Sequence, residues 1–193
     1  MTDDLQIAFT LPSGDQVDAI PFKIAKRSKL VADILADYDD DEQTVPIDVK
    51  NQDNEPEPSI AMMNLVLKYL KKYENEEPTQ IEKPLKDGDL MAQLTEWEKN
   101  FILDDLLEDK DAWKHQQLVE VMYIASSLNI EPLISLTTSW IAQEVSKICR
   151  TVKGSLKAAA EIRKFLNIPG NGGWTTEQEK ALAIEAEWPE DEE

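Results

Sequence analysis

The chain has 193 residues and a formal charge of -19, since 39 acidic residues outnumber 20 lysines and arginines. This acidity disfavours direct binding to nucleic acid, because the phosphate backbone would repel the protein at long range. No segment approaches the roughly 18 apolar residues of a membrane-spanning helix, so we expect no membrane association and a location in the cytoplasm, the nucleus or both.

The N-terminal segment has the alternating pattern of a β-hairpin. Residues 5–11 predict a strand, with Ile7 and Phe9 on its buried face, and residues 17–20 predict its partner. The sequence Pro-Ser-Gly-Asp at residues 12–15 is typical of the turn between two such strands. A hairpin is therefore expected to open the fold.

A helix and a third strand are expected next. The strand is indicated by residues 45–49, where Pro46 favours the edge of a sheet or the start of a strand. The helix is indicated by apolar residues at helical spacing, and an acidic loop at residues 37–42 ends it. These apolar residues are Leu30, Val31, Ile34, Leu35 and Tyr38.

A longer helix follows Pro58, which suits a first helical turn, and it stops before Pro78. Its apolar residues are Met62, Val66, Tyr69, Leu70 and Tyr73. Residues 74–95 and 104–111 are acidic and are interpreted as loops, the first of them mobile and with little regular structure.

The strongest helical patterns lie in residues 118–128 and 132–148, and Pro132 opens the second. Strands confined to the first quarter of the chain and followed by helices predict an α+β fold, in which helices cover one small sheet. We divide the chain into a globular domain, residues 1–150, and a helical extension, residues 151–193.

Side chains that could carry chemistry are few. With His115 as the one histidine and Cys149 as the one cysteine, the chain has no histidine or cysteine metal cluster, and no metal or cofactor is expected. No nucleophile elbow accompanies His115, which we interpret as a surface residue, and the glycine cluster at residues 170–173 is interpreted as a connector. Cys149 lies in a helical pattern and is expected to be a buried, reduced thiol. The sequence therefore indicates a protein that is not an enzyme.

The sign of the charge reverses between residues 147 and 164 of this acidic chain. Two interpretations remain open: a solvated helix face attracted to the acidic end of the chain, residues 185–193, or a surface that receives an acidic partner. The basic residues are Lys147, Arg150, Lys153, Lys157, Arg163 and Lys164, against Glu161.

Residues 160–188 carry two short apolar helical faces, and a capping box at residues 175–179 precedes the second. Two such helices make no core of their own, so they must pack on the preceding domain, on a partner, or on both. A Trp near the end of a short amphipathic helix is typical of an anchor in a groove, which favours binding over catalysis. The apolar residues are Ile162, Phe165 and Leu166 in the first face and Leu182 and Trp188 in the second.

A family resemblance rests on the order of these motifs. The end of the chain resembles the end of the Skp adaptors, which connect F-box proteins to cullins in SCF ubiquitin ligases. The motifs that carry the resemblance are, in order, EIRK, an aromatic and NI, a turn, an aromatic, TEQE and finally EAEW. The resemblance extends to residues 118–145, to Trp97-Glu98 with Phe101, and to the segment IAKRSKLVADIL. It implies a BTB/POZ-like fold for residues 1–150, two additional C-terminal helices, and the function of an adaptor that performs no chemistry.

The resemblance also implies partners for particular residues. Where the family pattern has an Asn-Tyr pair in the cullin-facing helix, this chain has Ser126-Ser127, so an aromatic contact is lost. Two alternatives therefore remain, an F-box-binding subunit of a cullin-independent complex and an elongin C-like scaffold, and a weak homodimer is left open. The residues assigned to F-box binding are Ile162, Phe165, Leu166, Ile168, Trp174, Leu182 and Trp188. Those assigned to the cullin are Ser126, Ser127, Trp97 and Phe101.

Overall fold

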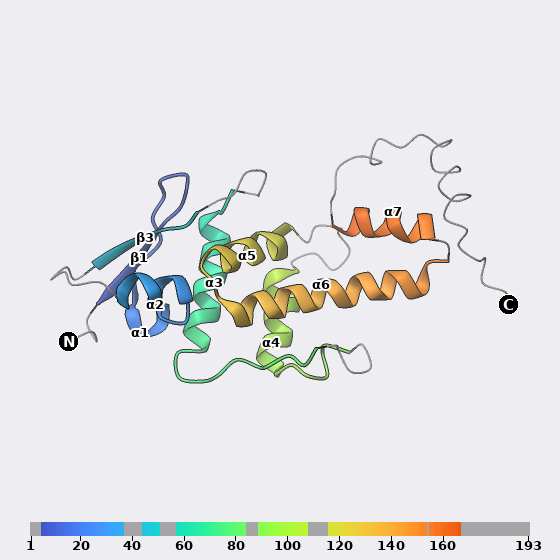
Figure 1. The fold of residues 1–193 in the computed structure, drawn as a ribbon, viewed down its shortest axis with the longest axis horizontal. Helices are drawn as coiled ribbons and strands as arrows, with labels where there is room; N and C mark the ends of the chain where they lie inside the picture. Colours follow the sequence, from blue (N-terminus) through green and yellow to red (C-terminus); the bar gives the residue numbers. More distant parts are fainter. Residues whose placement is uncertain are drawn as a thin grey trace.

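Three strands in the first quarter of the chain form one sheet, and helices follow it (Figure 1). The computed structural model describes residues 5–36, 44–50, 57–83, 89–107, 116–153 and 155–166. The strands are β1 (Gln6–Thr10), β2 (Ile20–Pro21) and β3 (Thr44–Asp48), in the order β2-β1-β3. The predicted α+β fold is confirmed.

The predicted hairpin is formed by β1 and β2, which pair antiparallel with Ile7 opposite Ile20. Gly14 has a φ of 87°, a conformation that the turn requires and that glycine adopts without strain. The return strand differs from the predicted residues 17–20 and lies at Ile20–Pro21. Before it, Gln16 forms an isolated bridge with Thr10, and the N–H of Val17 donates to the carbonyl of Phe9 at 3.0 Å.

The third strand, β3, runs parallel to β1 and forms an edge of the sheet, with Pro46 opposite Ala8. This edge position agrees with the prediction from Pro46. Ile7 and Phe9 of the central strand are fully buried, as their alternation predicts. The parallel pairing requires a crossover, which the two short helices between β2 and β3 provide.

The helices account for most of the remaining described chain. They are α1 (Phe22–Ala25), α2 (Lys29–Ala36), α3 (Ile60–Lys72), α4 (Glu96–Asn100), η2 (Phe101–Leu106, a π-helix), α5 (Gln116–Ser127), α6 (Glu131–Thr151) and α7 (Ser155–Phe165). All five apolar residues predicted for α3 are buried, and Ser59 caps the helix by accepting a hydrogen bond from the N–H of Met62. Pro132 lies in the first turn of α6, as predicted. No helix in the part of the chain that is described is long and apolar enough to span a membrane.

The helix predicted after the hairpin is α2, and Ile34 on it is 41% exposed, because the helix meets the core around Val31. The prediction for the second loop was wrong in part. Residues 104–106, predicted as loop, belong to η2, which continues directly from α4. Tyr38 and residues 108–111 lie outside the described residues.

The described parts of residues 74–95 have irregular backbone, as predicted, but they contain buried anchors. Leu90 is fully buried, and its N–H donates a hydrogen bond to the side-chain oxygen of Gln143 on α6. Arg27 donates to the carbonyl of Glu76 and forms an ion pair with Glu77. The acidic composition of the segment did not predict these contacts, because they are made by single apolar side chains and backbone groups that lie between polar residues.

Cys149 is exposed, so the prediction of a buried thiol was wrong. The last buried residue of α6 is Gln143, six residues earlier. Beyond that point α6 extends away from the sheet, with α7 alongside it (Figure 1). A side chain on this part of α6 that points away from α7 therefore faces solvent.

Candidate protein-interaction surfaces

The helical hairpin of α6 and α7 is the part of the described structure farthest from the sheet (Figure 1). Phe165 joins the two helices, since it is 7% exposed and its ring lies 5.9 Å from that of Trp140 at an interplanar angle of 31°. Ala158, seven residues before Phe165, is also buried. Positions separated by seven residues share a helix face, so this face of α7 packs against α6.

The outer half of α6 carries apolar side chains that the hairpin covers incompletely. Ile141, Val145 and Ile148 follow the spacing i, i+4, i+7 and are each half-buried. Ile162 and Leu166 of α7 are half-buried as well. The sequence pattern predicted the three α6 residues as apolar helix positions, but their partial exposure depends on where α6 leaves the core.

An aromatic cluster lies at the other side of the core, between α3 and α4. Trp97 and Phe101 stack with ring centroids 5.0 Å apart and an interplanar angle of 11°. Tyr69 of α3 and Tyr73, the residue that caps the end of α3, complete the cluster, and Tyr73 meets Trp97 edge-on at 5.7 Å. Trp97 is half-buried, whereas Phe101 is 1% exposed and offers no surface to a partner.

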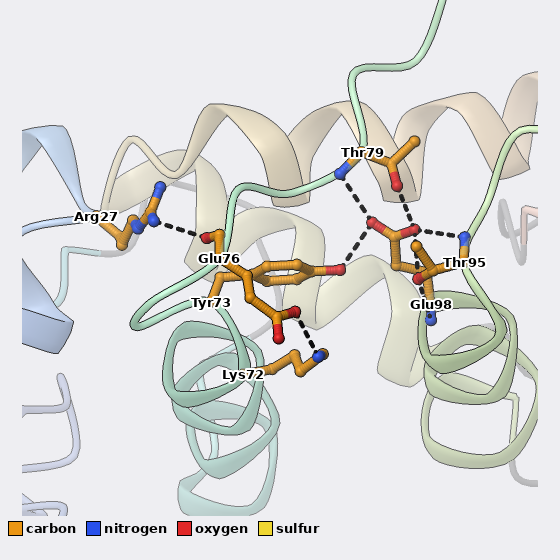
Figure 2. Close-up of polar contacts among 7 residues, drawn as sticks. All are labelled: Arg27, Lys72, Tyr73, Glu76, Thr79, Thr95 and Glu98. Carbon is orange, nitrogen blue, oxygen red and sulfur yellow. Dashed lines mark hydrogen bonds and ion pairs between the residues drawn. The ribbon is translucent and has the colours of Figure 1, made fainter.

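Glu98, next to Trp97, is a buried carboxylate at the centre of a hydrogen-bond network (Figure 2). It accepts hydrogen bonds from the hydroxyl of Tyr73 at 2.8 Å and from the N–H and hydroxyl of Thr79 at 3.1 and 2.6 Å. The N–H and hydroxyl of Thr95 both donate at 2.8 Å to Oε2, the oxygen that also accepts from the Thr79 hydroxyl. One side chain thus joins α3, the loop after it and the start of α4.

The network sets the protonation of both Glu98 and Tyr73. Burial raises the pKa of Glu98, but the hydrogen bonds from Thr79, Thr95 and Tyr73 outweigh it, and the pKa lies below its ordinary value. Burial, together with the hydrogen bond to the Glu98 carboxylate, raises the pKa of Tyr73. At pH 7 the glutamate is therefore ionised, so that both of its oxygens accept hydrogen bonds. The tyrosine is neutral, so that its hydroxyl can donate one.

The network was missed by sequence reasoning, although one signal was present. Thr95 and Glu98 form a capping box, in which each side chain bonds the backbone N–H of the other. The spacing Thr-x-x-Glu before an aromatic residue is the sequence signature of that motif. The contributions of Tyr73 and Thr79 come from 25 and 19 residues away and have no such local signature.

The two predicted cullin-binding pairs lie on different elements. Ser126 and Ser127 end α5, where Ser126 is exposed and Ser127 is half-buried with its hydroxyl donating to the carbonyl of Ile124 at 3.0 Å. The structure brings Trp97 and Phe101 together by stacking. Among the residues it describes, no hydrogen bond or ring contact links that pair to the two serines.

Comparison with known proteins finds relatives that align along almost the whole chain. An S-phase kinase-associated protein 1 homolog of Tetrahymena thermophila is 27% identical over 177 residues, which cover 92% of this chain and 90% of that protein. E3 ubiquitin ligase complex SCF subunits named sconC from Arthroderma otae and Emericella nidulans are both 26% identical, with 94% and 96% of each chain covered. No protein-family model matches the chain. Over more than nine-tenths of its length the chain is therefore similar to subunits of the Skp type.

The predicted F-box-binding residues of the chain fall into two groups. Ile162, Phe165 and Leu166 lie on α7, where Phe165 is occupied by its contact with Trp140 and the other two keep part of their surface. The others lie outside the residues that the structure describes, and these are Ile168, Trp174, Leu182 and Trp188. The first of the two additional helices is therefore α7, and the second stays a prediction.

Proposed function

We propose that this chain is a non-enzymatic adaptor subunit of an SCF-type E3 ubiquitin ligase, which binds F-box proteins and connects them to a cullin. The similarity to the sconC SCF subunits over more than nine-tenths of both chains carries the proposal. An adaptor of this kind alters no bond. It raises the effective concentration of a substrate at the site of ubiquitin transfer by holding two partners in one complex.

The α6–α7 hairpin supports the F-box side of the proposal. Half-buried apolar residues at helical spacing, Ile141, Val145 and Ile148, remain on α6 beside an α7 that is fixed by Phe165. A partner helix that covered them would remove their remaining apolar surface from water, which contributes about 25 cal/mol for each Å² that is buried. The residues after 166 would add Trp174, Leu182 and Trp188 to the same contact.

The cullin side is supported by the sconC relatives, whose names place them in SCF ubiquitin ligase complexes. This evidence favours the SCF adaptor over a cullin-independent complex or an elongin C-like scaffold. Ser126 and Ser127 at the end of α5 would then contact the cullin without the aromatic ring of the family pattern. We further propose that the protein acts in the cytoplasm and the nucleus.

Reconstitution tests the function directly. The full chain is mixed with an F-box protein and with the N-terminal domain of a cullin, and the mass of the eluted complex is measured by size-exclusion chromatography with light scattering. The proposal expects a complex of the three proteins at equal stoichiometry, and no association of the F-box protein with the cullin when the chain is left out. If the chain binds neither protein, the proposal is wrong.

A further inference from the structure

Three cations surround the turn at the outer end of the α6–α7 hairpin. Arg150 lies in the last turn of α6, Lys153 in the connection, and Lys157 in the first turn of α7. All three side chains are exposed. Consecutive Cα atoms are about 3.8 Å apart, so Arg150 and Lys153 are separated by no more than about 11 Å. We call these three residues the tip cluster.

The tip cluster has no ion-pair partner among the described residues. Within residues 144–166 the chain has two acidic side chains, Glu144 and Glu161, and each is within ion-pair distance of a different lysine. Glu144 pairs with Lys147, and Glu161 lies 3.9 Å from Lys164. In contrast, Lys23, Arg27, Lys68 and Lys72, nearer the sheet, each pair with an acidic residue in the described structure.

Stability of the hairpin does not account for the whole cluster. A cation in the last turn of α6 interacts favourably with the helix dipole, which explains Arg150. Lys157 lies in the first turn of α7, where a cation opposes the dipole and no acidic residue offsets it. Lys153 lies between the helices and contacts no carboxylate in the described part of the chain. Two of the three cations therefore make no evident contribution to the fold.

The surroundings of the tip cluster favour a short acidic protein segment over a charged polymer. At physiological ionic strength charges are screened over about 8 Å, so the cations of the tip attract an acidic segment that lies close to them. A nucleic acid or an anionic membrane extends over much longer distances and would meet the net charge of -19 of the whole chain. The tip also lies beside the half-buried residues of α6, at the outer end of the same helix.

We propose that the tip cluster binds an acidic segment of the F-box partner, next to the apolar contact made by α6 and α7. This inference rests on the proposed function and adds a selection rule to it. F-box proteins with a run of aspartates or glutamates beside the F-box bind more tightly than those without one. Complementary charge of this kind contributes to the rate of association and to the choice of partner.

The direct test uses a fluorescent twelve-residue peptide with six glutamates, and a matched peptide with six glutamines, in anisotropy titrations against the full chain. The tip variant carries Arg150→Gln, Lys153→Gln and Lys157→Gln. A control variant with the same change in net charge carries Lys26→Gln, Lys29→Gln and Lys71→Gln, which are exposed and form no ion pair in the described structure. Thermal unfolding checks that both variants fold.

The expected result is binding of the glutamate peptide that the tip variant weakens at least about fivefold and the control variant less than about twofold. The glutamine peptide should not bind, and added salt should weaken the interaction of the wild type. Equal weakening in both variants would mean that net charge alone acts, and this would overturn the proposal. Binding that appears only after the acidic residues of 185–193 are changed to glutamine or asparagine would assign the tip to the chain's own end, and it would overturn the proposal equally.

A second experiment separates this inference from the proposed function. One F-box protein is prepared with an acidic and with a glutamine-substituted flank, and both are titrated against the wild type and the tip variant. Binding of both forms with no effect of flank or variant would overturn the role of the tip and leave the adaptor function intact. No binding of either form, with the glutamate peptide still bound at the tip, would overturn the adaptor function and leave an acidic-peptide surface without an F-box partner.

Discussion

Ser28 and Leu128 are 100 residues apart in sequence and are joined by a buried hydrogen bond from the serine hydroxyl to the leucine carbonyl. The N–H of Lys29 donates to the carbonyl of Asn129 beside it, at 3.1 Å. Asn129 has a φ of 52°, in the left-handed region that the sharp turn from α5 to α6 requires. The start of α2 thus holds the corner that follows Ser126 and Ser127.

We predict that Ser28→Ala destabilises the fold by about 1–3 kcal/mol, because the buried carbonyl of Leu128 loses its side-chain donor. The N–H of Val31 also loses the serine oxygen, which accepts from it at 3.2 Å. Urea unfolding followed by circular dichroism measures the change. Ser126→Ala, at an exposed position of α5, is the control and should change stability by less than about 0.5 kcal/mol. Equal stability of the two variants would contradict the prediction.

The buried carboxylate of Glu98 makes stability depend on acid pH. Its pKa in the folded protein lies below the ordinary value of 4.5, so the contribution of the ionised group is complete above that value and is lost as the pH falls through the folded pKa. Glu98→Gln should cost about 2–3 kcal/mol at pH 7, since a neutral amide satisfies fewer of the five donors. The difference between wild type and variant should shrink as the pH is lowered below 4.5.

The measurement is urea unfolding of wild type and Glu98→Gln between pH 7 and pH 3. Glu96→Gln is a matched control, because Glu96 is on the same helix but is exposed and forms an ion pair with Lys99 at the surface. Surface pairs of this kind contribute about 0–1 kcal/mol. A cost of Glu98→Gln that stays constant over the whole range would show that the carboxylate charge is not what the network stabilises.

The ring contact between Phe165 and Trp140 should hold α7 on α6. Phe165→Ala leaves a cavity at this contact, and truncation of a buried Phe costs about 3–5 kcal/mol in a protein core. We expect faster hydrogen exchange in α7 with little change in α3 or α5, because α7 packs mainly on α6. Ala159→Gly, at an exposed position of the same helix, controls for helix propensity and should cost about 1 kcal/mol. Uniform acceleration across all helices would contradict a local role for Phe165.

Hydrophobic periodicity predicted most of the elements and their buried faces. Ile7 and Phe9 alternate on β1, and Tyr69 of α3 repeats at helical spacing, so local pattern alone assigned them to the core. The bond between Leu90 and Gln143 and the exposure of Cys149 could not be predicted in this way. Both depend on where α6 meets and leaves the rest of the molecule, which is a property of the packed structure and not of the helix.

The same reason limits prediction of the interaction surfaces. Periodicity identifies apolar positions but does not divide them between the core and a partner. Phe101, assigned to the cullin by resemblance, is in the core beneath Trp97, and Phe165, assigned to the F-box, is held by Trp140. Whether these residues contribute to binding stays a prediction. In this conformation Phe101 and Phe165 would act by positioning the neighbouring residues that retain exposed surface.

The end of α5 provides a gain-of-function test of the cullin contact. Ser127 occupies the place where the family pattern has a tyrosine, and its side chain is half-buried with a single hydrogen bond to the carbonyl of Ile124. Ser127→Tyr restores an aromatic ring at this position, so we expect cullin affinity to rise about fivefold or more, equivalent to about 1 kcal/mol. Calorimetric titration with the cullin N-terminal domain measures the change. Ser146→Tyr, at a half-buried position on α6, should leave the affinity unchanged, and an equal increase in both variants would mean that the added ring acts nonspecifically and not through the cullin surface.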